Sequence, residues 1–171
     1  MEISLVLQNG LLYGLVLSVL LGLTILISFS INPEIWVGDY PPDIKAAYTP
    51  VRSDTKRHKR IASLAFLIFL VGVLILSIIQ LSRLTGEPPI WAIFLSAFTT
   101  LLVFNIFDLL ILDLLIFNTI QPRMIILPGT EGMAGYKDYA FHFRGSLIGV
   151  VFCLVGALLT AGIAAFVFLV V

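Results

Sequence analysis

The stretch IWAIFLSAFTTLLVFNIFDLLILDLLIFNTI, residues 90–120, decides the class of fold. As one helix it is long enough to cross about 30 Å of hydrocarbon, which takes roughly 20 residues. It also holds Asn105, Asp108 and Asp113, and a charge at the bilayer centre costs at least about 2.5–3.5 kcal/mol. Each carboxyl must therefore meet a donor or keep its proton, because burial raises a carboxyl pKa. The stretch predicts a membrane helix with a polar centre.

The composition of the whole chain agrees with that class. Of its 171 residues, 60% are hydrophobic and only 12% are charged, whereas about a quarter are charged in a soluble domain. The formal net charge is zero, which gives no basis for nucleic-acid binding. The single cysteine, Cys153, lies in an apolar run and cannot form an intrachain disulfide. The first apolar block is too long for the core of a signal peptide, so we expect a retained span.

Four apolar runs are long enough to span the bilayer. The expected spans are residues 3–30, 61–81, 90–120 and 146–171, with longer polar connections at residues 32–60 and 121–145. The remaining connection, residues 82–89, is short, and short connections join antiparallel neighbours. The predicted fold is an all-α membrane protein: one domain, an antiparallel bundle of four transmembrane helices with a small cytoplasmic hairpin or loop as its cap.

Basic residues predict the orientation of this bundle. The connection at residues 32–60 carries six Lys and Arg, the one at 121–145 carries three, and the short one carries only Arg83. Cytoplasmic loops have an excess of Lys and Arg, so we expect both longer connections in the cytoplasm and both termini outside a bacterial or archaeal plasma membrane.

A dense basic run ends the first connection. Its candidate headgroup-binding residues are Lys56, Arg57, Lys59 and Arg60. They bind anionic lipid headgroups, at on the order of 1 kcal/mol for each charge, or they act only as an ordinary cytoplasmic anchor.

Other residues predict how the helices pack and where the first connection lies. Gly10 and Gly14 share a helix face that allows close approach of a neighbour. The small residues of the fourth span favour packing inside the bundle, whereas the large side chains of the second span favour lipid. Trp36, Tyr40 and Tyr48 suit the headgroup layer, where an aromatic ring is half wet.

The third connection reads as a hairpin. Residues 123–127 and 139–143 are rich in strand formers, and turn residues lie between them. On such a strand His142 and Arg144 would face the intramembrane acids; the alternative is that both are interfacial residues with a wet tip. The candidate residues at this cytoplasmic mouth are Lys137, Asp138, Tyr139, His142 and Arg144.

The two intramembrane acids have two interpretations. Five residues of α-helix place Asp108 and Asp113 roughly 140° apart, on different faces. They form a proton or cation relay in a polar cavity, or they are polar contacts that hold helices together. The expected donors to them are Asn105, Asn9, Thr99, Thr100 and basic groups of the third connection.

These interpretations lead to three candidate functions. The first is a small structural or accessory subunit in an oligomer or larger membrane complex, with Asp108 and Asp113 in helix–helix contacts. The second is a proton- or cation-conducting transporter or channel oligomer that uses the same acids. The third is a membrane-surface enzyme with a site on the cytoplasmic face. No metal-ligand spacing or phosphate loop indicates a catalytic residue, a metal or a cofactor. The expected partners are the lipid bilayer and copies of the chain or other membrane subunits, not nucleic acid.

Several motifs along the chain form a pattern. They are NPEIW (32–36) with DYPPD (39–43), FDLL (107–110) with Asp113, LPGTEG (127–132), YKDY (136–139) and FHF (141–143). Together they resemble a family of small four-span prokaryotic membrane proteins. The resemblance covers most of the chain and implies the four-span fold, but it brings no activity, ligand or site residue.

Overall fold

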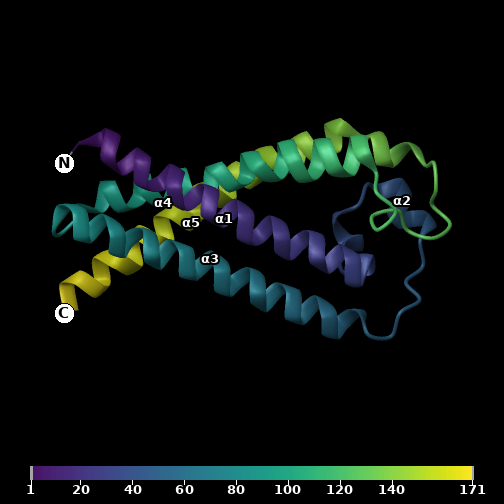
Figure 1. Cartoon of the computed structure of the whole chain (residues 1–171), viewed down its shortest axis with the longest axis horizontal. Helices are drawn as coiled ribbons and strands as arrows, with labels where there is room; N and C mark the ends of the chain where they lie inside the picture. The colour runs from purple at the N-terminus through teal and green to yellow at the C-terminus, as the bar shows by residue number, and fades with distance from the viewer. Residues whose placement is uncertain (1, 171) are drawn as a thin grey trace.

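The computed structural model describes residues 2–170 and consists of four long helical rods with a cap at one end (Figure 1). Its elements are α1 (Ile3–Ile31), η1 (Pro33–Asp39), α2 (Pro42–Ala47), α3 (Thr55–Thr85), α4 (Ile90–Phe107), η2 (Asp108–Ile120), η3 (Ala134–Lys137) and α5 (Tyr139–Val170). The short elements η1 and η3 are 3-10 helices, and η2 is a π-helix that continues α4. All regular elements within residues 2–170 are helical.

The four rods have the length and composition of membrane spans. The qualifying segments are Ile3–Ile31, Thr55–Thr85, Ile90–Ile120 and Tyr139–Phe168. They indicate a multi-pass membrane protein, because each is longer than the roughly 20 residues that cross a bilayer. Both ends of the chain lie at the left of Figure 1, and α2 lies at the opposite end with the two longer connections.

The bundle is organised around α4, which packs against both α1 and α5, while α3 packs on α1. The predicted glycine face of α1 is used inside the chain. A Cβ atom on Gly10 would lie 2.6 Å from Cβ of Thr99, and one on Gly14 would lie 2.6 Å from Cβ of Val103. The absence of side chains at these two glycines therefore lets α1 and α4 approach closely.

The second and fourth spans differ less in burial than their side chains suggested. Of the four candidate spans, α3 buries the smallest share of its apolar segment, which agrees with a lipid-facing helix. However, α5 is not enclosed by the bundle. It buries a stripe of small residues such as Ala161, which packs with Ile93 of α4, while Phe152 on α5 is 72% exposed.

A buried cluster of hydrogen-bonded polar side chains joins α1, α3 and α4 near the chain ends, far from the cap. The Nδ2 atom of Asn9 donates to Oγ of Ser77 at 2.9 Å and to Oγ of Ser96 at 2.8 Å. Asn9 is therefore not a donor to the acids. Nor are Thr99 and Thr100, whose hydroxyls donate to backbone carbonyls. A threonine hydroxyl in a helix can donate to the carbonyl one turn earlier, and its hydrogen is then not available to another acceptor.

We define the cap as residues 32–54 and 121–138. It has its own core, so the expectation that its aromatic residues lie in the headgroup layer is wrong for two of them: Tyr40 is 1% exposed and Tyr48 is 9% exposed. Together the two connections supply enough apolar surface to bury these rings against each other and against the end of η2. The core residues are Tyr40, Ile44, Tyr48, Phe117, Ile125, Leu127 and Tyr136.

The predicted hairpin in the third connection is wrong. Residues 139–143 form the first turns of α5, and Asp138 caps that helix by accepting a hydrogen bond from the N–H of Phe141 at 2.9 Å. An N-cap aspartate stabilises a helix start, and here it outweighs the strand preference of the aromatic residues. As a result α5 begins at Tyr139 rather than near Ser146. Likewise α3 begins at Thr55 rather than near Ile61, so the basic run is helical.

Candidate functional site

The π-helical half of the third span changes the geometry of the acids. In a π-helix each N–H bonds to the carbonyl five residues earlier. The N–H of Gln121, at the end of η2, donates to the Ile116 carbonyl in this way at 2.9 Å. Residues five apart therefore come close to alignment along the axis. The expectation that Asp108 and Asp113 lie on different faces is wrong, because both line the same cavity.

This cavity has a volume of about 450 Å³ and lies where the bundle meets the cap. Its wall is formed by α1, η1, α3, α4, η2 and α5. Three carboxylates line it, those of Asp39, Asp108 and Asp113, together with His142 and Asn105. Asp39 was not predicted from the sequence. It is the last residue of η1, and nothing in the local sequence indicates that this residue lies beside the third span.

The closest pair of titratable side chains in the cavity joins η2 to α5. Nδ1 of His142 lies 3.0 Å from Oδ1 of Asp113, and the imidazole is only 6% exposed. The other ring nitrogen, Nε2, is buried and has no hydrogen-bond partner among residues 2–170. The ring also packs on Phe117, with 4.8 Å between centroids. Asp138 is the N-cap residue of α5, and His142 lies in the first turns of the helix that it starts.

Asn105 joins α4 to α5 at the same cavity. Its Nδ2 atom donates to Oγ of Ser146 at 3.0 Å and to the Ser146 carbonyl at 3.3 Å. Gly149 makes room for this contact, because a Cβ atom there would collide with Oδ1 of Asn105. The predicted donor role of Asn105 is thus directed at α5 in this structure and not at the acids.

Asp39 brings an acid from the cap into the cavity wall. Its surroundings raise the pKa of its carboxyl, chiefly because burial penalises the charged form. The positive charges of Lys59 and Lys45 act in the opposite direction, while the negative charge of Asp113 raises the pKa further. Asp39 therefore binds a proton more readily than a free aspartate does, even though its side chain keeps an exposed surface.

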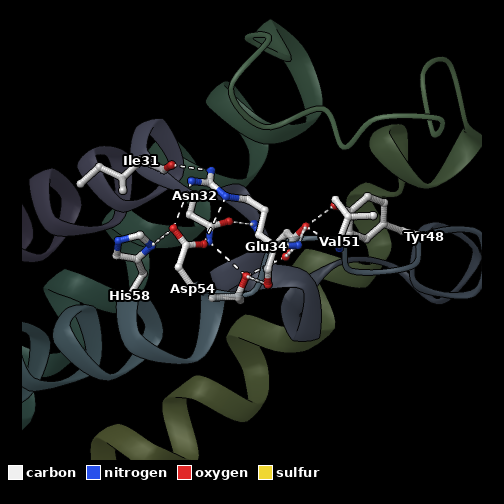
Figure 2. Close-up of polar contacts among 9 residues, drawn as sticks. Ile31, Asn32, Glu34, Tyr48, Val51, Asp54 and His58 are labelled. Carbon is white, nitrogen blue, oxygen red and sulfur yellow. Dashed lines mark hydrogen bonds and ion pairs between the residues drawn. The ribbon is translucent and has the colours of Figure 1, made fainter.

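A buried carboxylate holds the start of η1 in place (Figure 2), and Asp39 is the last residue of the same element. Glu34 is 5% exposed and accepts hydrogen bonds from the Tyr48 hydroxyl at 2.6 Å and the Thr55 hydroxyl at 2.7 Å. It also accepts from the backbone N–H groups of Val51 at 2.9 Å and Arg52 at 3.2 Å. Burial alone would raise the pKa of Glu34, but these four donors together lower it. Burial and the Glu34 charge raise the pKa of Tyr48 to about 12.

Further contacts tie the same part of the cap to the ends of α1 and α3, as Figure 2 shows. Oδ1 of Asn32 accepts from the N–H of Glu34 at 3.0 Å and caps η1. The Arg52 guanidinium donates to the Ile31 carbonyl at 2.9 Å, where α1 ends. Asp54 pairs with Nδ1 of His58 at 3.5 Å, one turn into α3. These contacts tie the first connection, which contributes Trp36 and Asp39 to the cavity wall, to α1 and α3.

The remaining predicted site residues lie outside the cavity. Lys137, Tyr139 and Arg144 are exposed, and Asp138 acts as the cap of α5. Of the predicted mouth residues, only His142 lines the cavity. The basic residues Lys56, Arg57, Lys59 and Arg60 are exposed on the first turns of α3.

Within residues 2–170, no group of three His, Cys, Asp or Glu side chains is arranged to hold a metal ion. Comparison of the chain with protein-family models, with curated proteins and with solved structures found no match. The resemblance to a four-span family therefore stays a prediction, and the function has to be inferred from the chemistry of the cavity.

Proposed function

We propose that the protein is a proton- or cation-conducting transporter or channel oligomer, with Asp108 and Asp113 as the groups that carry the ion. The observation that supports this most is that both carboxylates line one cavity together with Asp39 and His142. An ionisable residue within a membrane span is by default a functional-site hypothesis. Three carboxylates around one cavity also produce a negative potential that concentrates cations there.

The pair of Asp113 and His142 supplies a route for a proton. Histidine is the side chain whose ordinary pKa allows it to gain and lose a proton near neutral pH. With Nδ1 3.0 Å from the Asp113 carboxylate, a proton can be held between the two groups. Nε2 is the second ring nitrogen at which an imidazole can hold a proton, and it is buried without a hydrogen-bond partner among residues 2–170.

An accessory subunit is the second candidate, and it also has an observation in its favour. The contacts of Asp113 with His142 and of Asn105 with Ser146 join the third span to α5, as polar contacts between membrane helices do. Asp108 favours the relay over this alternative. Its carboxyl group has no hydrogen bond or ion pair to another residue in the part of the chain that the structure describes, so helix–helix contact does not account for it.

The proposal also includes a topology. The bundle is antiparallel and inserted in the plasma membrane, with both termini outside and the cap in the cytoplasm. The distribution of Lys and Arg supports this orientation, because nine of the ten lie in the two connections that were expected to be cytoplasmic. The cavity would then open toward the cytoplasmic side.

The test is Asp108→Asn in proteoliposomes that contain a pH-sensitive dye. We expect the flux driven by a pH gradient to be at least about tenfold lower in the variant than in the wild type, because an amide cannot carry a proton. It should still elute as the assembled protein. Glu87→Gln is the matched control, since Glu87 is an exposed acid in the connection at the other end of the bundle.

Two results would argue against the relay. If Asp108→Asn separates from its oligomer or complex on a native gel, the accessory-subunit function is favoured. If both flux and assembly match those of the wild type, Asp108 has neither role.

A further inference from the structure

The wall of the acidic cavity contains a second kind of side chain that a relay for protons does not need. Aromatic rings enter it from every long helix and from the cap. Those used in this inference are Phe29, Trp36, Phe66, Phe104, Phe117 and Phe141. They come from α1, η1, α3, α4, η2 and α5, so the rings surround the cavity and do not form a single patch.

The charge of the cavity selects for a cation. The carboxylates of Asp39, Asp108 and Asp113 line it, and His142 is the single basic side chain among the lining residues. Aromatic faces also attract cations, because the ring quadrupole places negative charge above the ring. Carboxylates and aromatic faces together are the chemistry that recognises an organic ammonium ion.

The size of the cavity points in the same direction. Its volume of about 450 Å³ lies within the range of roughly 300–1,000 Å³ that is usual for pockets that hold organic ligands. Such a space accommodates a cation with an apolar body. The body would pack on the aromatic rings while the charged end meets the carboxylates.

His142 lies beside one of the carboxylates that meet the charged end. Because Nδ1 faces the Asp113 carboxylate at 3.0 Å, the neutral imidazole carries its proton on Nδ1. Nε2 then has a free lone pair, and this atom is buried without a hydrogen-bond partner among residues 2–170. The imidazole therefore stays between Asp113 and Phe117 as part of the wall, and the charged end meets the carboxylates.

We propose that this cavity binds a protonated organic amine with an aromatic or other bulky apolar body, its body packed on the aromatic rings and its charge directed to the carboxylates. The inference rests on the proposed cation-handling function and names the class of substrate. Two sources share this chemistry: a free amine from solution and a lipid with an amine headgroup.

The probe is 2-phenylethylamine, and its neutral control is 2-phenylethanol, which has nearly the same shape. The reporter is the fluorescence of Trp36 in the full-length Trp91→Phe protein, because the chain has two tryptophans and Trp91 lies at the start of α4, away from the cavity. Nanodiscs of phosphatidylglycerol provide a bilayer without amine lipids. We expect saturable titration by the amine and no saturable response to the alcohol.

Substitutions in the wall should weaken this titration. Asp39→Asn and Asp108→Asn should each raise the apparent Kd by about tenfold or more, because each replaces an acid, which can become negatively charged beside the bound cation, by an amide that cannot. Phe104→Leu should raise it by a smaller factor through loss of an aromatic face. Phe98→Leu is the matched control, since Phe98 is on the same helix but outside the cavity lining. Size-exclusion elution identifies any variant that is misfolded, and Phe104→Leu keeps the test valid if an Asp variant fails to fold.

Further measurements distinguish a free amine from a lipid amine, and the amine-binding proposal from the relay proposal. If phosphatidylethanolamine in the nanodisc competes with the probe, the amine comes from lipid; if it does not, the amine is free in solution. An equal response to amine and alcohol, or no response to either, overturns the inference. If that happens while Asp108→Asn still abolishes the pH-driven flux, the relay stands without an organic substrate. If the flux test fails as well, both proposals fall.

Discussion

Two carboxyl groups in this protein, one buried and one partly buried, differ in the hydrogen bonds that they accept. Glu34 is saturated by the hydroxyls of Tyr48 and Thr55 and by two backbone N–H groups. The carboxyl group of Asp108 accepts no hydrogen bond from another residue within the part of the chain that the structure describes. A carboxylate that is fully satisfied by its own chain stabilises the fold, whereas one that faces a cavity unsatisfied is available to a ligand or a proton.

The structural role of Glu34 leads to a stability prediction. Glu34→Gln should lower the free energy of unfolding at neutral pH by roughly 1–3 kcal/mol. The glutamine side chain is uncharged, and its NH₂ group would face N–H and O–H groups that now donate to a carboxylate oxygen. Reversible unfolding in mixed detergent micelles measures the difference. Glu131→Gln is the control, since Glu131 is exposed in the third connection. Equal losses in the two variants would contradict the role of Glu34.

The same side chain predicts a pH dependence. The folded protein lowers the pKa of Glu34 below its ordinary value of 4.5, so the unfolded chain binds the proton more readily. The stabilisation is therefore fully present above about pH 4.5 and is lost as the pH falls through the lowered folded pKa. The difference between wild type and Glu34→Gln should shrink over that range. A difference that stays constant down to pH 3 would show that the Glu34 charge is not responsible.

At the scale of elements, the start of α5 and the π-helical end of the third span together bring His142 and Asp113 into contact in the cavity. The π-helix η2 turns Asp113 to the same side as Asp108, and the first turns of α5 bring His142 to meet it. Neither element alone makes the site. The relation depends on a helix that starts at Tyr139, seven residues before the predicted start of that span at residue 146.

The N-cap residue of α5, Asp138, can be tested directly. Asp138→Ala should cost about 1 kcal/mol of stability, since it removes the acceptor of the Phe141 N–H. It should also weaken the cation response of the cavity, because His142 sits in the turn that loses its cap. Asp138→Asn should restore most of both, since asparagine is an equally good cap. Thermal unfolding and the Trp36 titration are the two measurements. If alanine and asparagine behave alike, the cap does not position His142.

At the scale of the whole molecule, the cap and the chain ends lie at opposite ends of the bundle (Figure 1). Its long helices present many apolar side chains outward, such as Leu147 and Ile148 of α5, which is expected of surfaces that contact lipid. A protein of this shape in a bilayer would expose its cap on one side only.

Cysteine labelling in whole cells tests the proposed orientation. The chain has one cysteine, so Cys153→Ala provides a cysteine-free background. With a membrane-impermeant maleimide, Glu87→Cys in the short connection should react in intact cells, and Glu131→Cys in the cap should react only after lysis. The reverse pattern would place the cap outside and contradict the cytoplasmic assignment. Reaction of both positions in intact cells would contradict a bilayer between them.

The sequence by itself determined the four long helices, because runs of apolar residues of that length have few other stable arrangements in lipid. It also identified Asp108, Asp113 and His142 as candidates, since a costly charge among apolar residues is visible without a structure. Only the tertiary structure decided which of them meet. The π-helical turn, the early start of α5 and the return of Asp39 all depend on contacts between segments far apart in the chain, and local residue preferences do not encode such contacts. The cap followed the same rule: its tyrosines look interfacial alone and become core residues only when the two connections pack together.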